Sequence, residues 1–149
     1  YIVTAPGIRG EGIGKETIRK IEEVLNQKAI RNGHSGLDAM LLETEREEDA
    51  GSQQEREECL KRARFFHGNG YMKLGDRLYL QPPLHGEAKG VPLHLYVKNL
   101  STRGLDKDKI EQAIFAIYKD KYLAVNRIGI ADLNSCLEEM AVGKEYRFF

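Results

Sequence analysis

The stretch APGIRGEGIGKET, Ala5–Thr17, places three glycines at alternate positions between a β-branched run, YIVTA, and an amphipathic helical pattern. Glycine lets the backbone come close to a ligand, and the N-terminus of a helix directs N–H groups and positive dipole charge toward one point. The order strand, glycine loop, helix therefore predicts a binding site for a diphosphate. The alternative is a tight turn in which the glycines serve sterics alone.

Spacing excludes two common phosphate-binding loops. The Walker loop requires G-x-x-x-x-G-K-[ST], and this chain has Arg9 and Glu16 where that pattern needs its first glycine and its Ser or Thr. The dinucleotide loop requires G-x-G-x-x-G, and the third glycine would fall at Lys15 or Thr17, depending on where the pattern starts. Neither loop fits.

The pattern that fits is R-x-x-G-x-G, formed by Arg9, Gly12 and Gly14, which follows a strand through Pro6 and leads into a helix. Over residues 2–14 it resembles the acetyl-CoA-binding motif of the GNAT family of N-acetyltransferases. The resemblance implies an α/β (α+β) fold with a mixed, mostly antiparallel sheet flanked by helices, and a chain that starts inside the cofactor-binding strand. It implies acetyl-CoA as co-substrate, held by Ile2, Val3, Thr4, Arg9, Gly10, Glu11, Gly12, Ile13, Gly14, Lys15 and Phe66.

Local patterns predict the remaining elements. The apolar spacing of KETIRKIEEVLNQKAIRN predicts a helix that Gly33 ends, and residues 39–43 predict a buried strand. Ser52 and Glu55 form a capping box that opens a helix running to Gly68. Further downstream we expect strands over 71–84 and 91–100 in a hairpin, then helices from residue 106 and over 135–140.

Two departures from the family pattern affect catalysis. The resemblance implies a tyrosine that protonates the departing thiolate, but Phe66 occupies its position in FFHGNGY, and a phenyl ring has no proton to give. Cys59 stands where the family often has an asparagine facing the cofactor. Tyr79 is the candidate replacement acid, with His67 the weaker alternative.

A primary amine acceptor also needs a base, because an alkyl ammonium with a pKa of about 10 is almost fully protonated at pH 7. Glu43 and Glu45, at the end of the second predicted strand, are the best-placed carboxylates, and we select Glu43. Its alternative role is an ordinary solvated residue at a strand exit.

The amino-acid composition limits the classes of binding partner and the cellular location that we expect. The 23 Lys and Arg residues balance 23 Asp and Glu residues, which argues against nucleic acid and membrane surfaces as partners. The two cysteines are far apart, which fits a reducing, cytoplasmic location and predicts no metal site.

The sequence therefore predicts an enzyme that transfers acetyl from acetyl-CoA to a primary amine of a small molecule or peptide. The alternative is a non-catalytic acyl-CoA-binding or interaction module. Residues 1–100 would form the C-terminal half of a GNAT-like domain. Residues 101–149 would form a helical extension on the same domain, either covering the sheet or making a homodimer contact.

Overall fold

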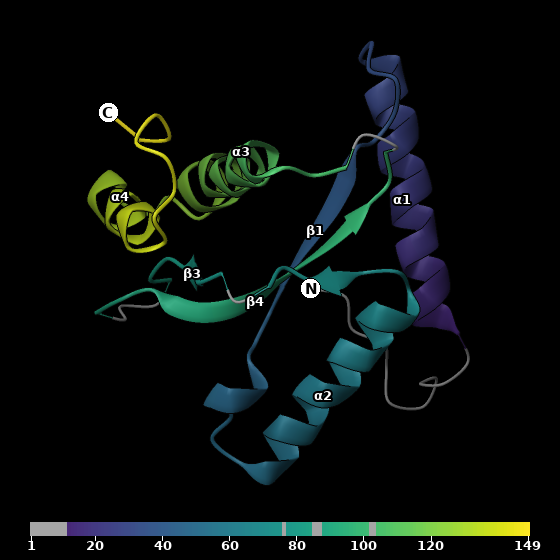
Figure 1. Cartoon of the computed structure of the whole chain (residues 1–149), viewed down its shortest axis with the longest axis horizontal. Coiled ribbons are helices and arrows are strands. Elements are labelled where there is room, and N and C mark those ends of the chain that lie inside the picture. Colours follow the sequence, from purple (N-terminus) through teal and green to yellow (C-terminus); the bar gives the residue numbers. More distant parts are fainter. Residues whose placement is uncertain (1–11, 76, 85–87, 102–103) are drawn as a thin grey trace.

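The computed structural model describes residues 12–75, 77–84, 88–101 and 104–149 (Figure 1). The elements follow one another as α1 (Ile13–Arg31), β1 (Ala39–Thr44), η2 (Glu47–Asp49), α2 (Gln53–Gly68), β2 (Met72–Lys73), β3 (Tyr79–Gln81), β4 (Val91–Asn99), α3 (Lys107–Ile117), η3 (Tyr118–Val125) and α4 (Ile130–Glu139). No helix in these ranges is long and apolar enough to cross a bilayer.

The strands form an antiparallel sheet centred on β4, which confirms the mostly antiparallel sheet expected from the sequence. The order is β1-β4-β2, and β3 also pairs with β4. The prediction of one long strand over 71–84 is wrong, because the segment divides into β2 and β3. Gly75 lies between them with φ of 48° and donates its N–H to the Lys73 carbonyl at 2.9 Å, so the chain turns out of the ladder there.

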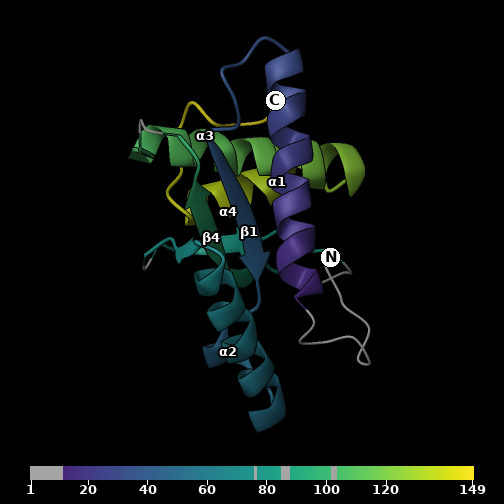
Figure 2. The same ribbon diagram turned by 90° about the vertical axis from the view of Figure 1, so that its right-hand side faces the viewer.

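Helices cover the two faces of the sheet, as Figures 1 and 2 show. On the α1 and α2 face, Met40, Leu42 and Tyr96 pack with Ile18, Ala63 and Phe66. On the opposite face, Leu41 and Leu95 pack with side chains of α3, η3 and α4. This division follows from the alternation of side chains along a strand. The helices of residues 107–139 thus share one core with the sheet.

The helix α1 has the glycine signals that the sequence predicts at its two ends. Gly12 is its N-cap with φ of 80°, and Gly33 follows its C-terminal end with φ of 85°. Gly14 lies inside the first turn rather than in the loop before it. The predicted apolar stripe is only partly buried, because Ile18 lies in the core whereas Val24 and Leu25 are exposed.

The hydroxyl half of the predicted capping box of α2 is confirmed, because the Ser52 hydroxyl accepts from the Glu55 N–H at 3.2 Å. The Glu55 carboxylate accepts from the Gly51 N–H at 2.8 Å, one residue before the Ser52 N–H that a capping box pairs. The last helix, α4, begins at Ile130 instead of Ser135, because Leu133 belongs to its buried face together with Cys136 and Leu137.

Candidate functional site

The N-terminus of α1 is the described part of the predicted cofactor loop. Ile2, Val3, Thr4, Arg9, Gly10 and Glu11 lie outside the described residues. Gly12 is exposed, and no described side chain caps the helix. The N–H groups of Ile13, Gly14 and Lys15 lie in the first turn, where an α-helix supplies no backbone acceptor. These donors and the helix dipole make this end suitable for an anion.

The two glycines of this turn serve different purposes. Among the described residues, no heavy atom lies within 4 Å of a Cβ built on Gly12, so the requirement for glycine that these residues show is the positive φ. A Cβ on Gly14 would lie 3.0 Å from Cζ of Phe65 on α2, so Gly14 permits close contact between the two helices. The steric explanation of the glycines therefore applies to Gly14, and Gly12 remains open toward solvent.

Phe66 lies in the core between α2 and the sheet. Its ring centroid lies 6.1 Å from that of Tyr71 and 5.6 Å from that of Tyr96. Burial, followed by the negative charge of Glu22, raises the pKa of Tyr71 to about 12. Cys59, at the other departure from the family pattern, is also buried, and Arg62 donates to its Sγ at 3.2 Å.

Glu43 and Tyr79, the two candidate catalytic residues, are in direct contact. The Tyr79 hydroxyl donates to Oε1 of Glu43, and the Tyr122 hydroxyl donates to the same oxygen at 2.6 Å. The Lys121 ammonium contacts Oε2 of Glu43. The structure thus assembles a carboxylate with two phenols and one primary ammonium, which we call the Glu43 cluster.

The Glu43 cluster is largely closed to solvent. Tyr79 is 1% exposed, and the side chain of Glu43 is 14% exposed, whereas Lys121 reaches the surface. Burial, followed by the charge of Glu43, raises the pKa of Tyr79 well above its ordinary value. The Tyr79 hydroxyl therefore stays protonated and donates a hydrogen bond to Glu43. This fits a residue that positions the carboxylate.

The C-terminal helices supply half of this cluster. Lys121 and Tyr122 belong to η3, an eight-residue π-helix, and Tyr118 of the same segment donates to the Leu80 carbonyl at 2.5 Å. π-Helical turns occur frequently at functional sites. Lys121 and Tyr122 were not among the site residues predicted from the sequence. The four-residue spacing of Tyr118 and Tyr122 could have indicated that the two side chains lie on one helix face. It did not indicate that this face meets Glu43.

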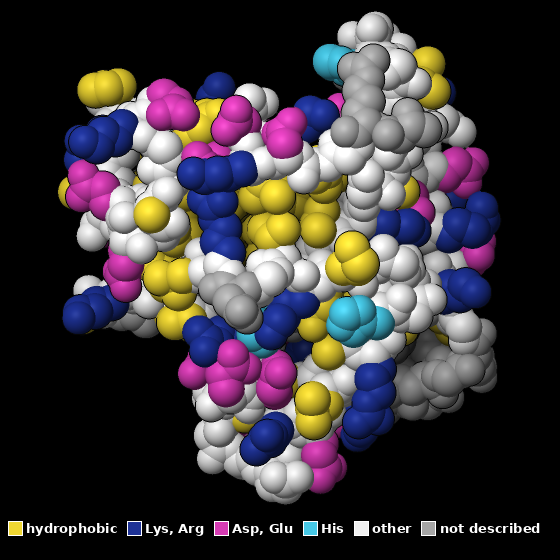
Figure 3. All heavy atoms as spheres, viewed as in Figure 1, with side chains coloured by type: hydrophobic (Ala, Val, Ile, Leu, Met, Phe, Trp, Pro, Cys, Tyr) yellow, Lys and Arg dark blue, Asp and Glu magenta, His cyan; other side chains and the backbone are white. Residues whose placement is uncertain are grey.

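An apolar hollow of about 360 Å³ lies on the same face of the sheet. Leu41, two residues from Glu43 on β1, forms part of its floor with Val97 and Leu74, and Ile110 and Lys109 of α3 form a wall. Figure 3 shows apolar side chains gathered in a depression on the viewed face. A hollow lined mostly by apolar side chains, with Asp38, Lys109 and Gln112 among its lining residues, is suited to a small organic group.

The other residues considered for acid–base chemistry lie elsewhere. Glu45 is 60% exposed and pairs with Arg62 at 2.8 Å. The His67 ring packs edge-on against Tyr96, with centroids 5.6 Å apart, on the α2 side of the sheet. Neither residue belongs to the Glu43 cluster.

No protein-family profile matches the chain, and no curated protein matches it. Comparison with solved structures shows that the chain has a GNAT-like fold. The similar structure is described as "Putative acetyltransferase from GNAT family from Bacteroides thetaiotaomicron". The TM-score is 0.54 at 21% sequence identity, and the match covers 87% of this chain. It spans 58% of the length of that protein.

Proposed function

We propose that this chain transfers the acetyl group of acetyl-CoA to a primary amine of a small molecule or peptide. The observation that carries the proposal is the N-terminus of α1. Gly12 leaves this end open to solvent in a fold that is similar to that of a protein described as an acetyltransferase. The N–H groups of Ile13, Gly14 and Lys15 would bind the diphosphate of CoA. Residues 2–4 and 9–11 would complete the cofactor site.

The edge of β1 that faces away from β4 supports the placement of the pantetheine arm. Within the described ranges β1 pairs only with β4, so its other edge offers backbone N–H and C=O groups. The pantetheine arm contains amides that pair with such groups. An arm that started at Gly12 and ran toward this edge would bring the thioester to the sheet that carries Glu43.

Glu43 is the base that we assign. It removes a proton from the acceptor ammonium, the amine nitrogen attacks the thioester carbonyl carbon, and the C–N bond forms as the C–S bond breaks. The new amide nitrogen still carries one extra proton after the attack and releases it to water. The CoA thiolate takes a proton from water, and Glu43 releases its proton to water. A thiol with a pKa of about 8.5 leaves without a strong acid, so Phe66 in place of tyrosine does not prevent the reaction.

The contact between Lys121 and Glu43 supports a primary amine as acceptor. The Lys121 side chain carries a primary ammonium on a flexible alkyl chain, and this ammonium contacts the Oε2 atom of Glu43. An acceptor ammonium has the same charge and shape at its reacting end. It would replace Lys121, whose side chain is 45% exposed and can turn into solvent.

A non-catalytic acyl-CoA-binding module is the second candidate. Phe66 favours it, because its ring is packed into the core and supplies no proton. In that case the Glu43 cluster serves only to attach the C-terminal helices to the sheet. The cytoplasm is the location we propose for either function, because Cys59 and Cys136 are free thiols.

Binding and turnover separate the two functions. We expect acetyl-CoA at 100 times its Kd to stabilise the chain by about 2.7 kcal/mol. For a chain of this size that corresponds to an increase in Tm of about 5 to 11 °C. Release of free thiol from acetyl-CoA should then depend on an added amine across a panel of small amines and lysine peptides. Binding without thiol release would support the module, and an unchanged Tm would contradict both functions.

A further inference from the structure

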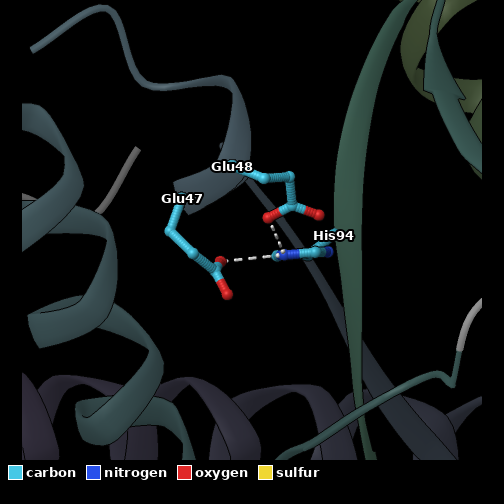
Figure 4. A group of neighbouring side chains, drawn as sticks. All are labelled: Glu47, Glu48 and His94. Carbon is cyan, nitrogen blue, oxygen red and sulfur yellow. Dashed lines mark hydrogen bonds and ion pairs between the residues drawn. The ribbon is translucent and has the colours of Figure 1, made fainter.

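Two glutamates and a histidine meet on the α2 side of the sheet. Glu47 and Glu48 belong to η2, in the connection between β1 and α2, and His94 belongs to β4 (Figure 4). One ligand atom from each of the three lies within 4.8 Å of the other two. This cluster is separate from both the N-terminus of α1 and the Glu43 cluster.

The two carboxylates approach the same nitrogen atom. Nε2 of His94 lies 2.9 Å from Oε2 of Glu47 and 3.3 Å from Oε2 of Glu48. One ring nitrogen carries at most one proton, so a single N–H can form a well-aligned hydrogen bond with only one of the two oxygens. Atoms bound to one ion at about 2.1 Å lie about 3.0 Å apart in octahedral and about 3.4 Å apart in tetrahedral geometry. The two observed distances fall in or near this range.

Thr44 provides a separate indication of a ligand. It lies directly opposite His94 in the ladder between β1 and β4, so the two side chains project from the same face as neighbours. Thr44 is 8% exposed, and its hydroxyl oxygen is buried with no hydrogen-bond partner among the described residues. A buried hydroxyl without a partner is costly, and a water molecule bound to a cation beside it would satisfy it.

The surrounding charges hold the carboxylates in place. Arg46 contacts Oε1 of Glu48 at 2.9 Å and also pairs with Asp49 at 3.1 Å. This contact leaves Oε2 of Glu48 directed at His94, in the way that outer hydrogen bonds orient metal ligands. Three carboxylates from residues 47–49 outweigh the one guanidinium, so the local charge attracts a cation.

We propose that Glu47, Glu48 and His94 bind one divalent transition-metal ion, Zn²⁺ or Mn²⁺, with the Thr44 hydroxyl beside it. One imidazole and two carboxylates form a donor set that suits these ions, and the exposed side of Glu48 leaves positions for water. The ion fastens the connection between β1 and α2 to β4. Arg46 and Asp49 of this connection also line a cavity of about 740 Å³ beside α2, so the ion makes one wall of that cavity rigid.

The test is a calorimetric titration of the chelator-treated full chain with ZnCl₂ and with MnCl₂, together with thermal melting at each metal concentration. We expect each chain to bind one Zn²⁺ or Mn²⁺ ion and to melt at a higher Tm. MgCl₂ and CaCl₂ at the same concentrations should raise the Tm less. Glu48→Gln should weaken uptake by at least about tenfold, since even partners outside the ligand set contribute that much. Its side chain is half exposed, so the variant is expected to fold.

Glu45→Gln is the matched control. Glu45 lies in the same connection and carries the same charge, but it pairs with Arg62 and is not part of the cluster. We expect its metal affinity to equal that of the unmodified chain. His94→Gln should lose the binding in the same way as Glu48→Gln. Absence of stoichiometric uptake of both ions, or uptake unchanged in Glu48→Gln and His94→Gln, would overturn the proposal.

Discussion

The replacement of Gly12 by alanine tests the cofactor site directly. Gly12 has φ of 80°, and an added Cβ would have no heavy atom of the described residues within 4 Å. The variant therefore clashes with none of these residues, and its expected cost in folding is the left-handed backbone, about 1 to 2 kcal/mol. That cost corresponds to a decrease in Tm of about 2 to 8 °C. If the first turn of α1 binds the diphosphate, the methyl group also stands in the path of the phosphate.

Gly33→Ala is the matched control at the other end of the same helix. Gly33 has φ of 85°, and an added Cβ would likewise have no heavy atom within 4 Å. The two variants should therefore lose nearly the same stability. Only Gly12→Ala should lose acetyl-CoA affinity, by at least about tenfold, which corresponds to about 1.4 kcal/mol. The measurements are thermal melting and calorimetric titration with acetyl-CoA on both variants and the unmodified chain.

Equal acetyl-CoA affinity in the two variants would show that the first turn of α1 does not bind the diphosphate. In that case Gly12 serves only the turn, and the diphosphate is bound elsewhere or not at all. A decrease in affinity in both variants would have the same consequence, because it would follow the loss of stability and not the position of the methyl group.

Three further predictions concern the sheet face that carries the C-terminal helices. Glu43→Gln should lower kcat by about 10²-fold or more with acetyl-CoA affinity unchanged, whereas Glu45→Gln keeps the unmodified kcat; equal rates in the two variants would remove Glu43 as the base. Tyr79→Phe removes one of two phenol donors to Glu43. It should lower kcat less than Glu43→Gln does and lower the free energy of unfolding by about 1 to 2 kcal/mol, and a kcat equal to that of the unmodified chain would exclude Tyr79 from the site. Glu111 is buried and accepts from Arg77 at 2.8 Å and from the Gly143 N–H at 3.0 Å, and the Arg77 contact above all lowers the pKa of Glu111. Glu111→Gln should cost about 2 kcal/mol at neutral pH. The pKa of Glu111 is lower in the folded chain than in the unfolded chain, so the stability difference between the unmodified chain and Glu111→Gln should be complete above the unfolded pKa of about 4.3. It should shrink as the pH falls through the lower folded pKa. Thermal melting of the unmodified chain and of Glu111→Gln between pH 7 and pH 3 measures this change.

Local signals in the sequence predicted most of the elements on the α1 and α2 face. The helix ends at Gly33 and Ser52 were found because a left-handed glycine and a hydroxyl cap act on the backbone within a few residues. The strand 39–43 was found because its apolar run is short and is bounded by polar residues. The break at Gly75 was missed, since alternation continues on both sides of it and only pairing with β4 separates the two strands.

The sequence also identified Glu43 and Tyr79 as separate candidates, each from its residue type and its place in a strand. Their contact could not be predicted, because it depends on the register in which β1 and β3 each pair with β4. The positions of Lys121 and Tyr122 depend further on how a π-helix turns its side chains toward the sheet. No pattern within a few residues records that orientation.

The sequence by itself determined where α1, β1 and α2 lie and the glycine signal at the start of α1, because caps, turns and periodicity are properties of neighbouring residues. The tertiary structure alone decided which polar side chains meet. His94 lies 47 positions from Glu47, and Lys121 lies 78 positions from Glu43. The first pair lies on the α2 face of the sheet and the second on the face that carries α3 and η3. Each pair comes together only because strand register and helix packing bring distant segments onto the same face.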